Sequence, residues 1–315
     1  MSTLLDVLAV TVPVFLIIGA GYLAVWRGLF SQGHVDGLMV FTQRFAIPCL
    51  LFLAMAQLDL ADGFDMRLLL TYYSGSLICF AAGIVGAIWW LRRAREDAVA
   101  VGFAAMFANT VLLGLPIAER AYGMDSLAPN YAIIALHAAF CYFTGVTAME
   151  LVRAGGSGLW GGMRSVAQSL SRNSLMIGVA LGLAVNVFGL PLPAQLTEAT
   201  VLVAQAALPA ALFGLGGVLV QYKPEGDARG IALVCGISLL VHPAWALGVG
   251  SVLGLETGAL RAAVLTAAMA PGVNAYLFAA MQGRAVRISA SSVLIGTGAS
   301  VVTVSAWLVL LGALG

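Results

Sequence analysis

The chain has 315 residues, of which 61% are hydrophobic and only 9% are charged. Soluble domains carry about 25% charged residues, so this composition excludes an ordinary soluble globule and predicts a protein that crosses a lipid bilayer several times. Fifteen Lys and Arg residues balance fourteen Asp and Glu residues, and this lack of basic excess excludes nucleic acid as a partner.

Ten apolar runs follow one another along the chain, each close to the roughly 20 residues that a membrane-spanning helix requires. The joins between them are short, so we expect no soluble domain between the spans. The runs therefore predict an all-α polytopic membrane protein with about ten transmembrane helices. In chain order they lie at 5–26, 37–57, 68–91, 98–118, 131–150, 173–190, 198–220, 230–254, 260–281 and 288–313.

The widest polar gap lies at the midpoint of the chain and contains five glycines, which is typical of a flexible linker. It divides the ten expected spans into two groups of five. Because each group has an odd number of spans, the second group enters the membrane in the opposite orientation. The predicted organisation is a first five-helix repeat at 1–152, a cytoplasmic linker at 153–172 and a second five-helix repeat at 173–315.

A short motif supports an internal repeat. The P-x-x-L-F sequence from Pro48 to Phe52 recurs from Pro209 to Phe213, at an offset of 161 residues, and several glycines and leucines match at the same offset. Inverted repeats are common in secondary transporters, whose substrate site lies near the membrane midplane between interrupted helices. The repeat therefore favours a transporter.

The distribution of Lys and Arg predicts the orientation. Joins after odd-numbered spans contain eleven of these residues, whereas joins after even-numbered spans contain three. By the positive-inside rule, the odd joins face the cytoplasm and both termini lie outside. Trp89 and Trp90, just before Arg92 and Arg93, are typical of an aromatic belt at the cytoplasmic interface.

Two expected spans, the fourth and the ninth, contain helix-breaking residues at matching places in the two halves: the runs Asn109–Pro116 and Ala270–Tyr276. Proline removes an intrahelical hydrogen bond and glycine lowers the cost of unwinding, so backbone groups are freed at membrane depth. If the helices cross there, their N-termini and Asn side chains would attract an anion; otherwise the prolines are ordinary kinks. The candidate substrate-binding residues are Asn109, Thr110, Gly114, Pro116, Pro271, Gly272, Asn274 and Arg44, and the candidate crossing or hinge residues are Pro48, Pro116, Pro209 and Pro271.

These motifs resemble those of the auxin efflux carrier family, which includes plant PIN carriers and bacterial permeases for malonate and related carboxylates. The resemblance rests on Ile47–Phe52, Asn109–Pro116 and Ala270–Tyr276 and extends over nearly the whole chain. It implies a fold like that of NhaA and the bile-acid symporters, in which a scaffold domain and a transport domain each draw on both repeats and helices 4 and 9 cross at their broken centres. It also implies that Asn109 holds a substrate carboxylate. With no long loop between its fifth and sixth spans, the chain resembles the short bacterial branch. This resemblance implies a multi-pass protein of the bacterial inner membrane, with both termini in the periplasm.

Few charged or titratable residues lie inside the expected spans. All fourteen acidic residues lie in joins or at span ends, which argues against a cation exchanger, since such exchangers keep a carboxylate at the crossing. Arg44, inside the second span, would either attract the anion into a cytoplasmic vestibule or extend to the interface and meet lipid phosphate. His137 and His242 are candidates for proton coupling, or each packs with a hydrogen bond to a backbone carbonyl.

The sequence therefore predicts a secondary active or facilitative transporter of a small organic anion, a carboxylate, with elevator-like alternating access to a midplane site. The alternative is a sodium- or proton-coupled exchanger, or a channel, on the same fold. No enzyme is predicted, because HExxH, G-x-S-x-G and P-loop motifs are absent from the sequence. No cofactor or metal ion is expected, and the expected partners are the anion and the lipid bilayer, with a homodimer as an open alternative.

Overall fold

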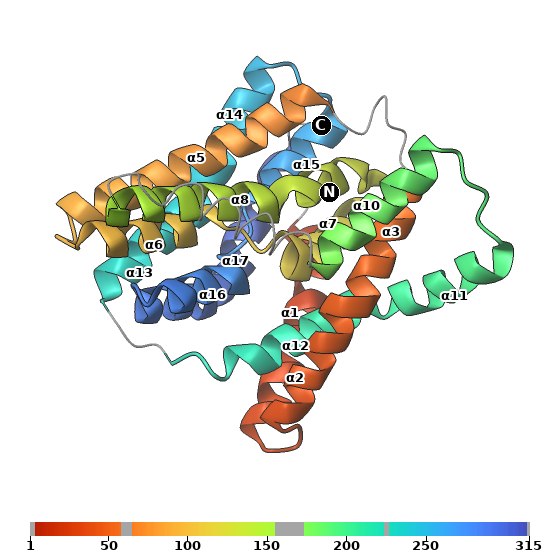
Figure 1. Ribbon diagram of the computed structural model, residues 1–315, viewed down its shortest axis with the longest axis horizontal. Coiled ribbons are helices and arrows are strands. Elements are labelled where there is room, and N and C mark those ends of the chain that lie inside the picture. The colour runs from red at the N-terminus through yellow and green to blue at the C-terminus, as the bar shows by residue number, and fades with distance from the viewer. Residues whose placement is uncertain (1–3, 58–64, 155–172, 224–226, 314–315) are drawn as a thin grey trace. The chain divides into compact units, whose positions relative to one another are not determined.

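The computed structural model describes residues 4–57, 65–154, 173–223 and 227–313 (Figure 1). Within these ranges the chain forms helices joined by short turns, with one isolated β-bridge and no strand. The expected all-α class is confirmed for this part of the chain. The expected linker, apart from the two residues that end the helix before it, lies outside the described ranges.

Within the described ranges, seven helical segments are long enough and apolar enough to cross a membrane, so the chain is a polytopic helical membrane protein. They are Leu5–Trp26, Gln32–Ala56, Met66–Trp89, Ala128–Arg153, Ala194–Leu219, Ala228–Val252 and Val286–Ala313. The other three expected runs form the shorter apolar helix α10 (Ser174–Val187) and two interrupted helices. The total of ten membrane-spanning segments and their inverted repeat therefore stay predictions.

The chain divides into two compact units, each made of segments from both halves of the sequence. The first unit contains Met1–Val12, Asp65–Val166 and Tyr222–Gly315, and the second contains Pro13–Phe64 and Ala167–Gln221. The boundary between them falls inside α1 (Leu4–Trp26). The other described helices of the first unit are α5 (Met66–Trp89), α6 (Arg95–Met106), η2 (Thr110–Gly114), α7 (Leu115–Tyr122), η3 (Met124–Ser126), α8 (Ala128–Ala154), α13 (Ala228–Gly236), η4 (Ile237–Val241), α14 (His242–Val252), α15 (Thr257–Ala267), α16 (Val273–Gln282) and α17 (Val286–Ala313).

The second unit depends on close approaches between helix backbones. Gly21 of α1 lies against the carbonyl of Phe213, and Gly182 of α10 lies against the carbonyl of Phe52, so that a Cβ atom at either glycine would overlap the oxygen. The residues of one contact are each 161 positions from their counterparts in the other. This equivalence supports the proposed internal repeat. The helices of this unit, besides most of α1, are α2 (Gln32–Phe41), η1 (Thr42–Ala46), α3 (Ile47–Ala56), α10, α11 (Ala194–Gln205) and α12 (Ala207–Leu219).

Three helices contain a π-helical turn that ends two residues before a proline. The turns are η1, η2 and η4, which precede Pro48, Pro116 and Pro243. A proline cannot donate to the carbonyl four residues earlier, so the local hydrogen-bond pattern widens and a carbonyl is freed. At Pro243 that carbonyl belongs to Leu239, and Trp307 Nε1 of α17 donates to it at 3.0 Å.

Side-chain caps fix the beginnings of α5 and α10. The Asp65 carboxylate accepts from the backbone N–H of Arg67 at 2.8 Å, and the Asn173 amide oxygen accepts from the N–H of Leu175 at 2.9 Å. Such caps satisfy backbone donors that have no intrahelical partner. Hydrogen bonds from the Arg67 side chain also lower the pKa of Asp65.

An aromatic core holds the inner ends of the two interrupted helices in the first unit. Phe103 of α6 stacks on Phe278 of α16, with ring centroids 3.9 Å apart and an interplanar angle of 10°. Both rings are fully buried. Next to them, Gly83 of α5 and Gly102 of α6 allow those helices to touch, because a Cβ at Gly83 would lie 2.7 Å from the Gly102 Cα. These contacts position α6 and α16 where each leads to its interruption.

Candidate functional site

The two interrupted helices pair with each other inside the first unit. The first ends at Met106 and resumes as η2 at Thr110; the second ends at Ala267 and resumes as α16 at Val273. Between these points, the Asn109 N–H donates to the Ala270 carbonyl at 2.8 Å, and the Gly272 N–H donates to the Phe107 carbonyl at 2.8 Å.

We call the paired segments 107–109 and 270–272 the crossing. Its central residues, Ala108 and Pro271, form an antiparallel bridge. Each interrupted helix thus supplies hydrogen-bond partners for backbone groups that the other has lost. The expected breaks are present, and they form a paired, buried structure rather than two separate proline kinks.

Asn109 is the polar side chain of the crossing that lacks an internal partner. The residue is only 5% exposed, and its side-chain nitrogen has no hydrogen-bond partner among the described residues. Its backbone carbonyl accepts from the Gly114 N–H at 3.0 Å, which fixes the turn that follows. An unpaired buried amide costs about 1–3 kcal/mol, so two N–H donors are held here at the expense of stability.

Two helix N-termini begin at the crossing. η2 begins directly after Asn109, whose side chain does not cap it, and α16 begins after Gly272, which has no side chain to provide a cap. Helix N-termini carry partial positive charge and free N–H groups. The crossing therefore offers hydrogen-bond donors, which suit a ligand rich in acceptor oxygens.

Asn274 lies in the first turn of α16, two residues beyond Gly272. The Tyr142 hydroxyl on α8 donates to its side-chain oxygen at 3.3 Å. This bond occupies the acceptor of the amide and leaves the amide N–H groups as donors. Tyr142 thus orients a second asparagine next to the crossing.

Side chains on neighbouring helices form hydrogen bonds with backbone carbonyls inside the two interruptions. His137 Nε2 on α8 lies 3.2 Å from the Ala108 carbonyl, and the Ser238 hydroxyl on η4 donates to the Met269 carbonyl at 3.2 Å. A carbonyl accepts, so the His137 Nε2 carries the proton, and its Nδ1 faces the Cys141 sulfur at 3.7 Å. His137 therefore makes the backbone contact that the sequence offered as the alternative to proton coupling.

His242, the other candidate for proton coupling, lies in α14 and is fully buried. Its Nε2 is 3.3 Å from the Tyr72 carbonyl and 3.4 Å from the Ser76 hydroxyl. Its Nδ1 has no partner in the part of the chain that the structure describes. The Tyr72 ring lies beside both imidazoles, with its centroid 5.0 Å from that of His242 and 5.7 Å from that of His137.

Small residues allow the segments of the crossing to approach. A Cβ at Gly272 would lie 3.1 Å from the Phe107 ring, and one at Gly114 would lie 3.3 Å from the Met269 side chain. Gly296 on α17 lies against the Pro271 ring, where a Cβ would be 2.8 Å from Cδ. The predicted glycines, Gly114 and Gly272, therefore lie in tightly packed positions at the crossing.

The structure brings most of the predicted substrate-binding residues to the crossing or its first helical turns, but not all of them. Thr110 is 4% exposed and begins η2, and Pro116 lies one residue inside α7. Arg44, Pro48 and Pro209 belong to the second unit, where Arg44 is an exposed residue of η1. Sequence reasoning missed Tyr142 and Ser238, because a single hydroxyl in an apolar helix carries no pattern that identifies its target.

Comparison with known proteins extends over almost the entire chain. A family model described as "Membrane transport protein" matches residues 6–157 and 160–308. A Rhizobium meliloti (strain 1021) protein named "Putative malonate transporter" is 25% identical over 312 residues, which cover 97% of this chain and 96% of that protein. A Methanothermobacter thermautotrophicus protein named "Uncharacterized transporter" is 27% identical over 309 residues, which cover 97% of each chain.

Proposed function

Because the chain belongs to the membrane transport protein family, we propose that it carries a small organic carboxylate anion across the bacterial inner membrane. This family is the auxin efflux carrier family that the motifs of the chain resemble. The protein is a multi-pass membrane transporter of a small molecule and not an enzyme. The proposal concerns the substrate, the site and the mechanism.

The observation that carries the proposal is the unpartnered side-chain nitrogen of Asn109 in a buried crossing with two helix N-termini. All of these groups are donors, and a carboxylate is an acceptor with about four lone-pair sites. A single helix terminus contributes only about 0.3–1 kcal/mol, so several donors must converge to hold an anion. Asn109, Asn274 and the freed N–H groups provide that convergence.

The relative named for malonate favours a short dicarboxylate as the substrate. Among the described residues, the polar side chains that hydrogen-bond to carbonyls of the two interruptions or to Asn274 are those of His137, Ser238 and Tyr142. None is a carboxylate, whereas a desolvated sodium ion or proton normally requires one. This chemistry supports the anion carrier over the alternative of a cation exchanger or channel.

Alternating access would follow from movement of the first unit, which contains the whole crossing, against the second unit as scaffold. We extend the proposal to ten membrane-spanning segments in two inverted repeats with both termini outside. The Lys and Arg distribution supports this orientation, and the equivalent contacts of Gly21 and Gly182 support the repeat. The homodimer stays a prediction.

Ligand-dependent stability tests the substrate class. The purified protein is heated with malonate, malate, acetate, an indole acid or chloride, with and without sodium. A ligand that binds the native state stabilises it by RT ln(1 + [L]/Kd), about 2.7 kcal/mol at a hundredfold excess over Kd. We expect carboxylates, led by a dicarboxylate, to raise the unfolding temperature without sodium. A shift with sodium alone would instead support the cation-coupled alternative.

Substitutions of His137 separate a backbone contact from proton coupling. In His137→Gln the amide can still donate to the Ala108 carbonyl, whereas His137→Leu leaves that carbonyl with the Thr110 N–H, at 2.9 Å, as its donor. The lost hydrogen bond costs about 0.5–1.5 kcal/mol. We expect carboxylate uptake by proteoliposomes to survive in the Gln variant, with its pH dependence unchanged, and to fall with stability in the Leu variant. Loss of pH-dependent uptake in the Gln variant would assign the proton to His137.

A further inference from the structure

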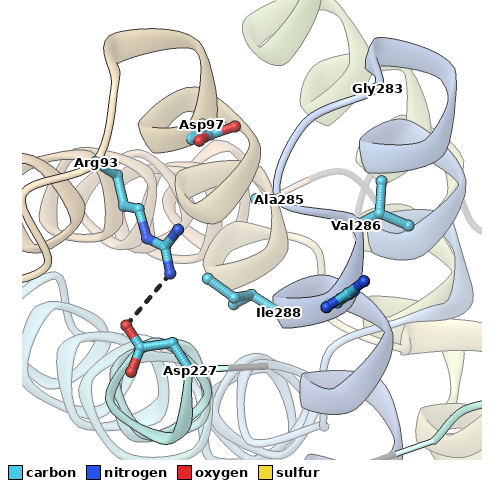
Figure 2. A pocket seen from close by; sticks show the side chains of 8 residues that line it. Arg93, Asp97, Asp227, Gly283, Ala285, Val286 and Ile288 are labelled. Carbon is cyan, nitrogen blue, oxygen red and sulfur yellow. Dashed lines mark hydrogen bonds and ion pairs between the residues drawn. The ribbon is translucent and has the colours of Figure 1, made fainter. Parts of the chain in front are cut away.

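A second polar site lies in the first unit, away from the crossing. It is a cavity of about 410 Å³ between the start of α6, the start of α13 and the turn that joins α16 to α17 (Figure 2). Its lining residues are Arg93, Asp97, Asp227, Gly283, Ala285, Val286, Arg287 and Ile288.

The charges around this cavity are only partly paired. Arg93 and Asp227 form an ion pair (Figure 2), in which Arg93 Nη2 lies 3.4 Å from Asp227 Oδ2. The Asp227 carboxylate also caps α13 by accepting from the Arg229 N–H at 3.0 Å. Asp97 and Arg287 line the same cavity and have no ion-pair partner in the described ranges. Asp97 is partly buried and Arg287 is exposed, so the cavity presents one unpaired carboxylate and one unpaired guanidinium that is open to solvent.

This arrangement discriminates between ligand charges. A simple anion would pair with Arg287 but meet the carboxylates of Asp97 and Asp227, and a simple cation would meet Arg93 and Arg287. A zwitterion can satisfy both unpaired groups at once. The N-terminus of α17 adds N–H donors on the side of Arg287, because Ala285 before it has no side-chain acceptor.

The cavity lies where membrane spans begin and end. The span of α5 ends at Trp89, and those of α13 and α17 begin at Ala228 and Val286. Trp89 and Trp90 are 81% and 53% exposed, as is typical of indoles at the level of lipid headgroups. The zwitterions that this part of a membrane protein meets at high local concentration are therefore phospholipid headgroups.

We propose that the cavity binds a phosphate ester linked to a primary ammonium, as in the headgroup of phosphatidylethanolamine. The phosphate lies against Arg287 and the α17 N-terminus, and the ammonium donates to Asp97. A choline headgroup lacks the N–H donors for that contact, and a glycerol headgroup lacks the positive charge.

Thermal unfolding of the protein in phosphatidylcholine nanodiscs tests the site. Part of the lipid is replaced by phosphatidylethanolamine or by phosphatidylglycerol, and free phosphoethanolamine is added separately to the protein in detergent. We expect phosphatidylethanolamine to raise the unfolding temperature and phosphatidylglycerol not to do so. A shift with free phosphoethanolamine identifies a soluble source of the same chemistry, and a shift with the lipid alone identifies the membrane.

Matched variants localise the effect. Asp97→Asn and Arg287→Gln should each weaken binding about tenfold or more, since each removes one charge-assisted contact. The controls Asp36→Asn and Arg229→Gln change exposed charges that do not line the cavity and should retain the shift. Equal shifts with all three lipids, or a shift that survives in both cavity variants, would overturn the proposal. If a variant fails to fold, the headgroup preference of the wild-type protein decides.

Discussion

Asn109→Ala is expected to weaken carboxylate binding about 10- to 150-fold, because hydrogen bonds to a charged group contribute about 1.5–3 kcal/mol. The side-chain nitrogen has no internal partner, so its removal breaks no hydrogen bond of the ligand-free protein. The unfolding temperature without ligand should therefore stay the same or rise. Isothermal titration and ligand-free thermal unfolding of the same preparation measure the two effects.

The control is Asn130→Ala in the same unit. Asn130 is also buried, but its amide nitrogen already donates to the Thr266 hydroxyl at 2.9 Å. This variant should lose stability, since the hydroxyl is left without that donor, and should keep most of its affinity. If Asn109→Ala instead lowered ligand-free stability and left affinity unchanged, Asn109 would be a structural residue and the proposed site would be wrong.

The contrast between these asparagines indicates how the crossing functions. A structure optimised for stability alone would pair or remove a buried amide, as it pairs Asn130. In the crossing, the side-chain nitrogen of Asn109 is instead left unpaired, which lowers the stability of the ligand-free protein. Local conflicts of this kind are expected at functional sites, where a ligand completes the hydrogen bonding.

The interruptions of the two helices could be predicted from the sequence, because proline, glycine and asparagine act on the backbone locally. The runs from Asn109 and from Ala270 mark places where an intrahelical hydrogen bond is lost, whatever the surroundings. The pairing of Asn109 with Ala270 is consistent with the repeat, since these two positions differ by the repeat offset of 161 residues.

The surroundings of the crossing could not be predicted in this way. Tyr142, Ser238 and His137 lie on helices that are apolar nearly all round, so no periodicity indicates which face meets the crossing. Their bonds to Asn274 and to freed carbonyls depend on tertiary packing. The same limit applies to Arg44. From the sequence, Arg44 could either attract the anion or extend to lipid phosphate, and the structure shows it as an exposed residue of η1.

Gly21→Ala and Gly182→Ala are expected to destabilise the protein strongly and to similar extents. A Cβ at Gly21 would overlap the Phe213 carbonyl and one at Gly182 would overlap the Phe52 carbonyl, both of them backbone atoms inside helices. Such atoms move only if the helices separate, and overpacking of this kind costs about 1–3 kcal/mol or more. The unfolding temperature in detergent measures the loss.

Gly19→Ala is the matched control, because it lies on the same helix as Gly21 and a Cβ there would meet nothing within 4 Å. Alanine is the better helix former by about 1 kcal/mol, so this variant should be neutral or slightly stabilised. Equal unfolding temperatures for Gly19→Ala and Gly21→Ala would contradict the close helix contact. A large loss at Gly21 without a comparable loss at Gly182 would contradict the equivalence of the two contacts, and with it the main structural support for an inverted repeat.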